Sequence, residues 1–219
     1  MSLDDKAGLT NEILREEPPR NHTGSWIRIV LAQGDSLELP IHIWMQSGYK
    51  VGTTLSPFAE EDLRAAQQLA EGIEMGLGYL DRKPCTTKEM RVYLKRKKMN
   101  EETANRVVQA LQDKGWLDDL AYAQRFVTLM SSRWSRRELA WKLIQRGVSR
   151  ELIEEALTTE GSEGEYAAAL QAAQKFWKRG TAVDWELRRK KMMHYLERRG
   201  FDSSSIHFAL DRVAGETNE

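Results

Sequence analysis

From about residue 59 onward, apolar side chains recur every three or four residues, which is the period of an amphipathic helix. The pattern before that point is different. Residues 26–32 are dense in apolar and β-branched side chains, and a Gln-Gly-Asp turn sequence separates them from residues 36–39. This arrangement predicts a strand over 26–32 that pairs with a strand over 36–39.

Proline usage divides the chain in the same place. All five prolines lie within the first 84 residues, so nothing after them interrupts helices. Residues 1–23 are polar and carry two of the prolines, which predicts a flexible tail. Residues 24–57 are expected to form a small β-rich element, in which 41–45 fit a short helix or a strand and 53–55 fit a further strand. An element of this size is expected to pack on the helix that follows it.

The helical region contains an internal repeat. Three segments, beginning at Glu89, Glu138 and Lys191, align without gaps. Each predicts a helix, a turn of the kind that favours a left-handed residue, and a second helix that starts at a capping residue. The matched positions are Leu94, Leu143 and Leu196 in the first helix, Lys98, Gly147 and Gly200 at the turn, and Asn100, Ser149 and Asp202 at the cap.

A longer helix is predicted before each pair, over 59–82, 119–133 and 164–179. Three-helix modules of about 50 residues bury a shared core by stacking. The predicted fold is therefore mainly α, with three tandem three-helix repeats in an elongated, curved array behind the β-rich element. The predicted divisions are a tail over 1–23, the β-rich element over 24–57, repeats over 58–117, 118–160 and 161–214, and a tail over 215–219.

Charge is sorted by helix, although the chain is neutral overall. Lys plus Arg and Asp plus Glu both number 33, which counts against coating nucleic acid through bulk charge. The middle helix of every repeat is basic, with six basic residues against one acid in 86–99 and in 131–150, and against two acids in 185–200. Two interpretations stay open, a solvated face and a surface that touches a polyanion or an acidic protein. The candidate contact residues are Arg91, Lys95, Arg96, Lys97, Lys98, Arg133, Arg136, Arg137, Lys142, Arg146, Arg188, Arg189, Lys190, Arg198 and Arg199.

Motifs for catalysis or metal binding are not found. Cys85 is the only cysteine, so no internal disulfide and no thiolate cluster can form. The four histidines are isolated, and neither a zinc-protease motif nor a phosphate loop is present. We therefore expect no enzymatic activity, no cofactor and no metal. The sequence also lacks an apolar signal core and a membrane span, which favours the cytoplasm.

The segment between the first two repeats admits two interpretations. Asp118 and Asp119 could be a carboxylate pair for a metal or for acid–base chemistry, but a helix N-cap followed by a first-turn acid is favoured. Trp116, Tyr122 and Phe126 could stack on nucleic-acid bases. Their helical spacing favours packing in the core instead.

The same segment, Gly115 to Val127, resembles the signature of the RecX family: a glycine and an aromatic residue, a leucine, paired aspartates, an aromatic-alanine step and a second aromatic residue. Residues 147–153 and 198–201 resemble its later turns. The resemblance covers about residues 60–213, and the β-rich start resembles the N-terminal extension of longer members. Lys98 departs from the glycine that is usual in the first repeat. The signature residues, expected to be structural, are Gly115, Leu117, Asp118, Asp119, Tyr122, Ala123 and Phe126.

Members of this family bind the RecA recombinase, chiefly as its filament on DNA, and modulate its ATPase, strand-exchange and coprotease activities. The resemblance therefore implies a non-catalytic regulator of homologous recombination, DNA repair and the SOS response, with inhibition as the expected sign. It implies a cytoplasmic monomer without a membrane partner, which could also touch DNA through the basic helices.

Two other function classes stay open. A three-helix unit with a basic helix is compatible with a helix-turn-helix transcription regulator that binds DNA by itself. A generic α-helical scaffold for protein interactions would also show tandem repeats, and its basic faces would only keep it in solution.

Overall fold

The computed structural model describes residues 11–22, 24–179 and 185–217. They fall into two compact units, one formed by the chain up to Lys83 with Met90–Trp116, the other by Pro84–Glu89 with the chain from Leu117 onward. A four-stranded antiparallel sheet is followed by three tandem three-helix repeats, which confirms the predicted fold class. None of the helices in the described ranges is both long and apolar enough to cross a membrane.

The β-rich element is one antiparallel sheet with the strand order β3-β2-β1-β4. Strands β2 and β3 form the predicted hairpin, with Trp26 opposite Pro40 and Val30 opposite Ser36. The segment that fitted either a helix or a strand is the helix α1, which follows β3 directly. The bounds are Asn11–Glu17 for β1, Trp26–Leu31 for β2, Ser36–Pro40 for β3, Ile41–Ser47 for α1 and Thr54–Leu55 for β4.

Strand β1 corrects the prediction that residues 1–23 are a tail. It lies between β2 and β4 and pairs with both. Ile13 is fully buried, and the Asn11 side chain accepts the Gln33 N–H at 3.1 Å and donates to Glu60 at 3.1 Å. Only these two side chains of the strand are buried, so the sequence lacks the alternation that would reveal it. Residues 1–10 lie outside the described ranges.

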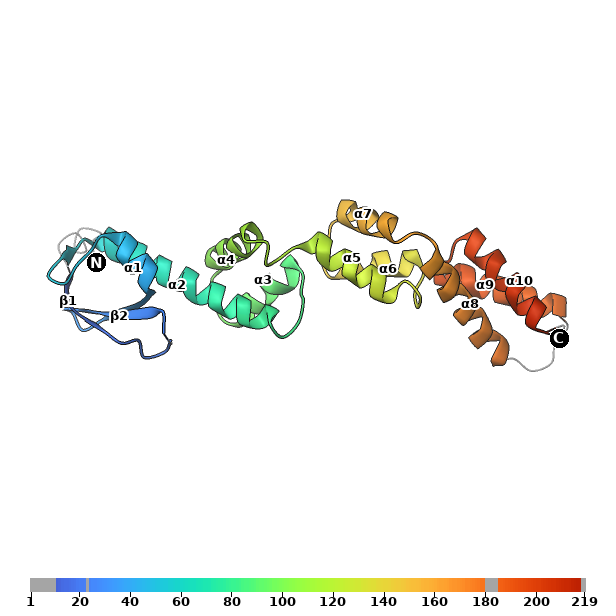
Figure 1. Cartoon of the computed structure of the whole chain (residues 1–219), viewed down its shortest axis with the longest axis horizontal. Helices are drawn as coiled ribbons and strands as arrows, with labels where there is room; N and C mark the ends of the chain where they lie inside the picture. Colours follow the sequence, from blue (N-terminus) through green and yellow to red (C-terminus); the bar gives the residue numbers. More distant parts are fainter. Residues whose placement is uncertain (1–10, 23, 180–184, 218–219) are drawn as a thin grey trace, which may run out of the picture. The chain divides into compact units, whose positions relative to one another are not determined.

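Helix α2 (Pro57–Leu80) joins the sheet to the first repeat within one unit (Figure 1). Ser56 caps it by accepting the Ala59 N–H at 3.1 Å, and Pro57 occupies the first helical position, where no N–H is needed. The start of α2 contributes Leu63 to the core of the sheet, as expected for an element too small to fold alone. Its later turns pack on α4 (Glu101–Asp113).

The later turns of α2 approach α4 closely because glycines face it. A Cβ atom on Gly72 would lie 2.5 Å from Val107 Cγ2 and 2.7 Å from Met99 Cε. A Cβ atom on Gly76 would lie 2.8 Å from Leu111 Cδ1. Gly78 is exposed, and a Cβ atom there would meet nothing within 4 Å.

Each repeat has its own buried core, and the three cores are built alike. Leu94, Leu143 and Leu196, the identical residues of the alignment, are all fully buried. The helix α10 continues to Thr217 and so corrects the predicted tail over 215–219, because a glycine at 215 lowers helix propensity without ending the helix. The remaining helices are α3 (Thr87–Arg96), α5 (Asp119–Met130), α6 (Arg136–Gln145), α7 (Arg150–Glu160), α8 (Glu163–Lys178), α9 (Trp185–Arg199) and α10 (Ser203–Thr217).

The turn between the middle and third helices is the same in all three repeats, which confirms the alignment. The backbone at the turn position is left-handed in each case, with φ values of 66°, 86° and 82° at Lys98, Gly147 and Gly200. Two residues later a side chain caps the third helix. The capping residues Asn100, Ser149 and Asp202 accept backbone N–H groups at 2.8, 3.4 and 2.7 Å.

The glycines of α2 give a matched pair of substitutions. Gly72→Ala is expected to destabilise the protein by about 1–3 kcal/mol, because the added methyl group overlaps the β-branched Val107 side chain. Gly78→Ala, on the same helix, is expected to stabilise it by about 0.5–1 kcal/mol through helix propensity. Urea unfolding of the two variants checks this, and equal effects would contradict the described approach of α2 to α4.

Candidate interaction surface

The starts of α3 and α6 are each bound to the repeat that follows, and we call these two sets of contacts the first and second junction. Both lie within the unit that contains residues 84–89. Thr86 Oγ1 donates to the Arg146 carbonyl at 2.6 Å, and Ser135 Oγ donates to the Arg199 carbonyl at 2.7 Å. Each hydroxyl also accepts the backbone N–H three residues later at 3.2 Å. One buried hydroxyl thus caps its own helix and satisfies a carbonyl at the end of the next repeat's middle helix.

A carboxylate from the following repeat completes each junction. Asp119 Oδ1 accepts the Thr87 N–H at 2.7 Å, and Glu165 Oε1 accepts the Arg136 N–H at 3.1 Å. Both acids lie in the first turn of a first helix, α5 or α8, where the helix dipole favours negative charge. Asp118 caps α5 by accepting two backbone N–H groups at 2.8 and 3.0 Å. The paired aspartates therefore have structural roles.

A cationic side chain crosses the following turn at each junction. The ammonium group of Lys88 donates to the Gln145 carbonyl at 3.3 Å, and the guanidinium of Arg137 donates to the Arg198 carbonyl at 2.9 Å. A Cβ atom on Gly147 would lie 2.5 Å from Lys88 Cβ, and one on Gly200 would lie 2.9 Å from Arg137 Cβ. These two turns need glycine for space as well as for their left-handed backbone.

Lys98 shows the same turn without this crossing cation. Its φ of 66° is left-handed, a conformation that a residue with a side chain adopts at modest cost. Among the described residues, no earlier three-helix repeat supplies a cation to lie across it. The departure from glycine in the first repeat therefore has a physical reason, since only the later two turns are covered.

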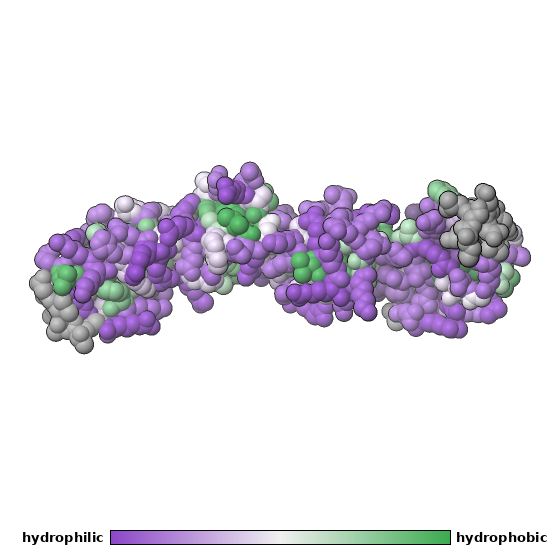
Figure 2. All heavy atoms as spheres, turned by 180° about the vertical axis from the view of Figure 1, so that it is seen from behind, coloured by the Kyte–Doolittle hydropathy of each residue, from purple (hydrophilic) through white to green (hydrophobic). Residues whose placement is uncertain are grey.

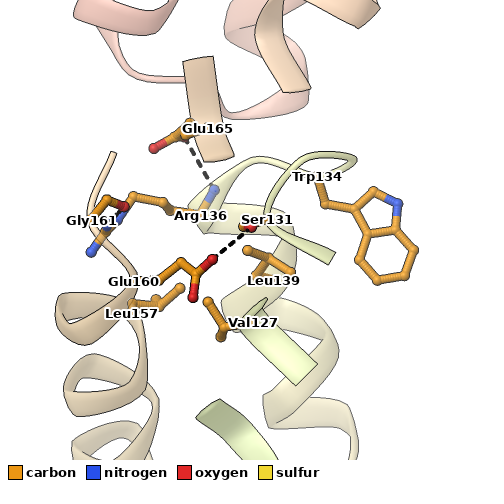
Figure 3. Close-up of a pocket in the computed structure, with 9 residues that line it drawn as sticks. All are labelled: Val127, Ser131, Trp134, Arg136, Leu139, Leu157, Glu160, Gly161 and Glu165. Carbon is orange, nitrogen blue, oxygen red and sulfur yellow. Dashed lines mark hydrogen bonds between the residues drawn. The ribbon is translucent and has the colours of Figure 1, made fainter. Parts of the chain in front are cut away.

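Glu165 is the most buried acid of the second junction. Figure 3 shows its contact with the Arg136 backbone beside a small cavity of about 10 Å³, which Ser131 and Glu160 also line. The residue is 3% exposed, and Glu165 Oε2 has no hydrogen-bond partner among the described residues. Burial raises the pKa of the Glu165 carboxyl above its usual 4.5, against the lowering effect of the Arg136 N–H.

Part of the predicted basic surface holds the second unit together. The Arg136 guanidinium donates to the Gly161 carbonyl at 3.1 Å, in addition to the role of Arg137 described above. Arg146 lies 4.7 Å from the ring centre of Phe126 and bonds the Tyr122 hydroxyl. The guanidinium of Arg199 is 3.4 Å from a Glu138 carboxylate oxygen. These four cations are structural first, because removing them would break contacts between or within repeats.

Five other predicted contact residues are held by a neighbour in their own repeat. The partners are aromatic rings, a carboxylate or an amide, so these cations are partly committed to the fold. The pairs are Arg91 with Asn105, Lys95 with Glu101, Lys97 over Tyr93, Lys142 at 4.3 Å from the Trp134 ring centre, and Arg188 at 3.7 Å from the Trp177 ring centre.

The other six predicted contact residues have charged groups that are available to a binding partner. In the part of the chain that the structure describes, their side chains have no hydrogen bond, ion pair or ring contact, and five of the six are exposed. They come from all three repeats, on or beside the middle helices. On the face that Figure 2 shows, the surface is largely hydrophilic, with apolar side chains in separate areas. These residues are Arg96, Lys98, Arg133, Arg189, Lys190 and Arg198.

The aromatic residues of the signature segment differ in burial. Phe126 is 8% exposed and Tyr122 is half-buried, as their spacing predicts. Trp116 is 50% exposed, so the prediction that it packs in the core is wrong. It follows Gly115, whose φ of 68° ends the helical path of α4, and so it leaves the apolar face that the spacing assumed. The other signature residues Leu117 and Ala123 are buried.

Sequence reasoning missed the junctions, although a signal for them existed. Thr86 and Ser135 each stand three residues before a glutamate, the spacing of a capping box at the start of a helix. Their second role, toward the next repeat, joins residues 60 and 64 positions apart. No group of three or more His, Cys, Asp and Glu side chains within the described ranges is placed to hold a metal ion.

Comparison with known proteins gives the same division into repeats. The models of the first, second and third three-helix domains of RecX match residues 73–111, 118–157 and 163–210. The regulatory protein RecX of Enterococcus faecalis is 28% identical over 198 residues, which are 90% of this chain and 74% of that protein. The one from Prosthecochloris aestuarii is 32% identical over 145 residues, which are 65% of this chain and 93% of that protein.

Solved structures share the fold. A crystal structure of a regulatory protein RecX superimposes with a TM-score of 0.79 at 23% identity, over 93% of this chain and all of that chain. The crystal structure of RecX from Lactobacillus salivarius gives a TM-score of 0.61 at 20% identity, over 68% of this chain and 98% of that chain.

The buried Glu165 predicts a particular pH dependence. Its folded-state pKa lies above the unfolded value, so the folded wild type binds more protons and gains stability as the pH falls from neutral toward about 4.5. Glu165→Gln removes the cost of burying the charge. The variant is therefore expected to be more stable than wild type at neutral pH, with a margin that shrinks as the pH approaches 4.5.

Urea unfolding at a series of pH values measures this margin. Glu163→Gln, which alters an exposed acid in the same helical turn, is the matched control. A margin that does not change with pH, or one that the control reproduces, would show that the Glu165 carboxyl is not held as described.

Proposed function

The chain belongs to the RecX family of regulatory proteins, and we propose that it regulates a RecA-type recombinase by binding the recombinase filament on DNA. The family places the chain among regulators, and the RecA-type partner is taken from the family resemblance. The proposal is that the chain acts in the cytoplasm, as a monomer and without a chemical step of its own.

One observation carries the proposal: exposed cations without partners among the described residues recur beside the middle helices of all three repeats. Arg96 and Lys98 represent the first repeat, Arg133 the second, and Lys190 and Arg198 the third. A tandem array presents such charges at intervals, and a filament presents its subunits and its DNA phosphates at intervals as well. Contacts at several points then add, although each exposed contact is weak by itself.

Regulation would follow from binding energy alone. A protein that binds one state of a filament more tightly than another shifts the equilibrium toward that state. Holding or capping one state changes filament assembly, ATP turnover, strand exchange and coprotease activity together. Inhibition is the expected sign, since a partner that spans neighbouring subunits restricts their cycle.

Co-sedimentation with three targets tests this function: recombinase filaments on DNA, recombinase alone and DNA alone. We expect retention on the filaments that exceeds retention on either component and that weakens with salt. Binding to one DNA sequence without recombinase would instead indicate a transcription regulator. No salt-sensitive binding to any target would indicate a scaffold, and either result would overturn the proposal.

The cations without partners provide the matching substitutions. Arg96→Glu with Lys98→Glu is expected to weaken filament binding about tenfold at low salt, because two contact charges are reversed while no described bond of the fold is lost. Arg106→Glu with Lys114→Glu makes the same charge change on the exposed side of α4 and its end. This control is expected to bind within about twofold of wild type.

The measurement is a titration of labelled filaments with each folded variant. Equal weakening by both pairs would mean that overall charge, rather than the middle helix, determines binding, and that result would count against the proposed surface.

A further inference from the structure

The second and third repeats differ at one place beside the junctions. Since Asp119 and Glu165 make the same bond, α5 and α8 can be aligned residue by residue. Their shared core positions agree, because Ala123 matches Ala169 and Val127 matches Ala173, all buried. The neighbouring positions do not agree. Where α5 has the aromatic residues Tyr122 and Phe126, α8 has Ala168 and Ala172.

In the second repeat these aromatic side chains fill the space beside the junction. Tyr122 stacks near Phe126 with their ring centres 6.4 Å apart. Arg146, from the end of α6, lies 5.8 and 4.7 Å from the two ring centres. The guanidinium at this position therefore lies against two aromatic rings, and it donates a hydrogen bond to the Tyr122 hydroxyl.

In the third repeat the alanines leave a pocket of about 400 Å³. Arg199, which corresponds to Arg146, lies 5.9 and 5.8 Å from the ring centres of Tyr195 and Phe201, and it also lines this pocket. Arg133 reaches the same pocket from the turn after α5, and Gln171 and Lys175 reach it from α8, beside the two alanines. The ring of Trp134, which also lines this pocket, projects away from the small Glu165 cavity in Figure 3.

The pocket carries positive charge that the fold neutralises only in part. Three of its lining side chains are cations, and no carboxylate lines it. Arg133 and Lys175 are exposed and have no side-chain partner among the described residues. Arg199 is partly compensated, since its guanidinium lies 3.4 Å from the Glu138 carboxylate and 3.4 Å from the Tyr195 hydroxyl. Three cations from three elements around one hollow match an oxyanion.

We propose that this pocket binds a phosphate group, which a nucleic-acid strand or a free nucleotide would supply. Arg133, Lys175 and Arg199 would neutralise the phosphate oxygens, and the Gln171 amide could donate a further hydrogen bond. The volume exceeds that of one phosphate and admits a nucleotide-sized group. The pocket has no feature aimed at a particular base, so binding would position a strand without reading its sequence.

This inference deepens the proposed function, and it rests on that function only for the biological source of the phosphate. Relative to the second repeat, the third repeat has alanine in place of two aromatic side chains and so loses apolar packing at this place. The three cations line the space that such side chains would fill. The aligned second repeat serves as the internal reference for a pocket that is filled.

The test uses three variants of the full chain. Ala172→Phe restores the aromatic residue of the second repeat, keeping every charge while filling the pocket. Arg133→Ala with Lys175→Ala removes two cations and leaves the pocket open. Arg125→Ala, at an exposed cation of α5 outside the pocket, is the charge control. The probes are inorganic pyrophosphate, thymidine monophosphate and a short oligothymidylate, and the readouts are the affinity and the indole N–H resonance of Trp134.

Wild type is expected to bind at least one probe with a shift of the Trp134 resonance. Binding should weaken about tenfold for each cation removed and become undetectable in Ala172→Phe, while Arg125→Ala stays within about twofold of wild type. Binding of the oligothymidylate alone would identify a strand as the source, and binding of all three probes would admit a nucleotide. Should Ala172→Phe not fold, the paired alanine variant decides.

Two results would overturn the proposed phosphate site. One is a probe affinity in the paired alanine variant that equals that of wild type, and the other is a Trp134 resonance that none of the probes shifts. Co-sedimentation of the same variants with recombinase filaments separates this outcome from failure of the proposed function. If the protein binds filaments but none of the phosphate probes, the proposed function is retained and the phosphate site is rejected. If it binds the probes but not filaments, the phosphate site is retained and the proposed function is rejected.

Discussion

A buried hydroxyl that bonds in two directions organises the second unit. Thr86 and Ser135 each cap their own middle helix and, at the same time, satisfy the terminal carbonyl of the next repeat's middle helix. Helix ends carry unsatisfied backbone groups, and burying them without partners is costly. Because this bond joins two helix ends that would otherwise both need water, it fixes, within the second unit, where residues 84–89 meet the second repeat and where the second repeat meets the third. The other parts of each junction are then placed by this contact: the cation that crosses the turn, the glycine of that turn, and the carboxylate in the first turn of α5 or α8.

This constraint also determines which cations remain for a partner. The middle helices are basic throughout, yet Arg136, Arg137, Arg146 and Arg199 are committed to the fold. A substitution at one of them would change repeat packing as well as surface charge, so loss of function there would say little about contact. The six cations without partners among the described residues are a smaller set of candidate contacts, two in the first unit and four in the second. One of them, Arg133, borders the pocket that the third repeat leaves open.

Much of the fold could be predicted from the sequence because its signals are local. The shared leucines, the left-handed turns and the capping residues all act within about ten residues of one another, so a single chain reveals them by repetition. The basic middle helices were visible for the same reason. Strand β1 was not, since its burial depends on pairing with β2 and β4, and only Asn11 and Ile13 show it. Trp116 does not follow the helical spacing, because it comes after Gly115, where the helix has ended.

The candidate site was less predictable, because its geometry is non-local. Whether Arg137 is a contact residue or a structural one depends on Arg198 and Gly200, more than 60 positions away. The pocket depends on two alanines of α8, and alanine is common in helices. Only the alignment of α8 with α5 through the Glu165 and Asp119 bonds shows that these alanines stand where α5 has aromatic residues.

The most direct test is the coupling between Arg137 and Gly200 in a double-mutant cycle of unfolding free energies. In wild type, Gly200→Ala carries two costs, the strain of a left-handed alanine and the overlap with the Arg137 side chain. An Arg137→Ala background removes the overlaps with Arg137 Nε and with Arg137 Cζ, the latter at 3.0 Å, and leaves the strain and the 2.9 Å approach to Cβ. The same substitution should therefore cost about 1 kcal/mol less in that background, measured as an interaction energy. An equal cost of Gly200→Ala in both backgrounds would contradict the account, because it would mean that no cation lies across the turn.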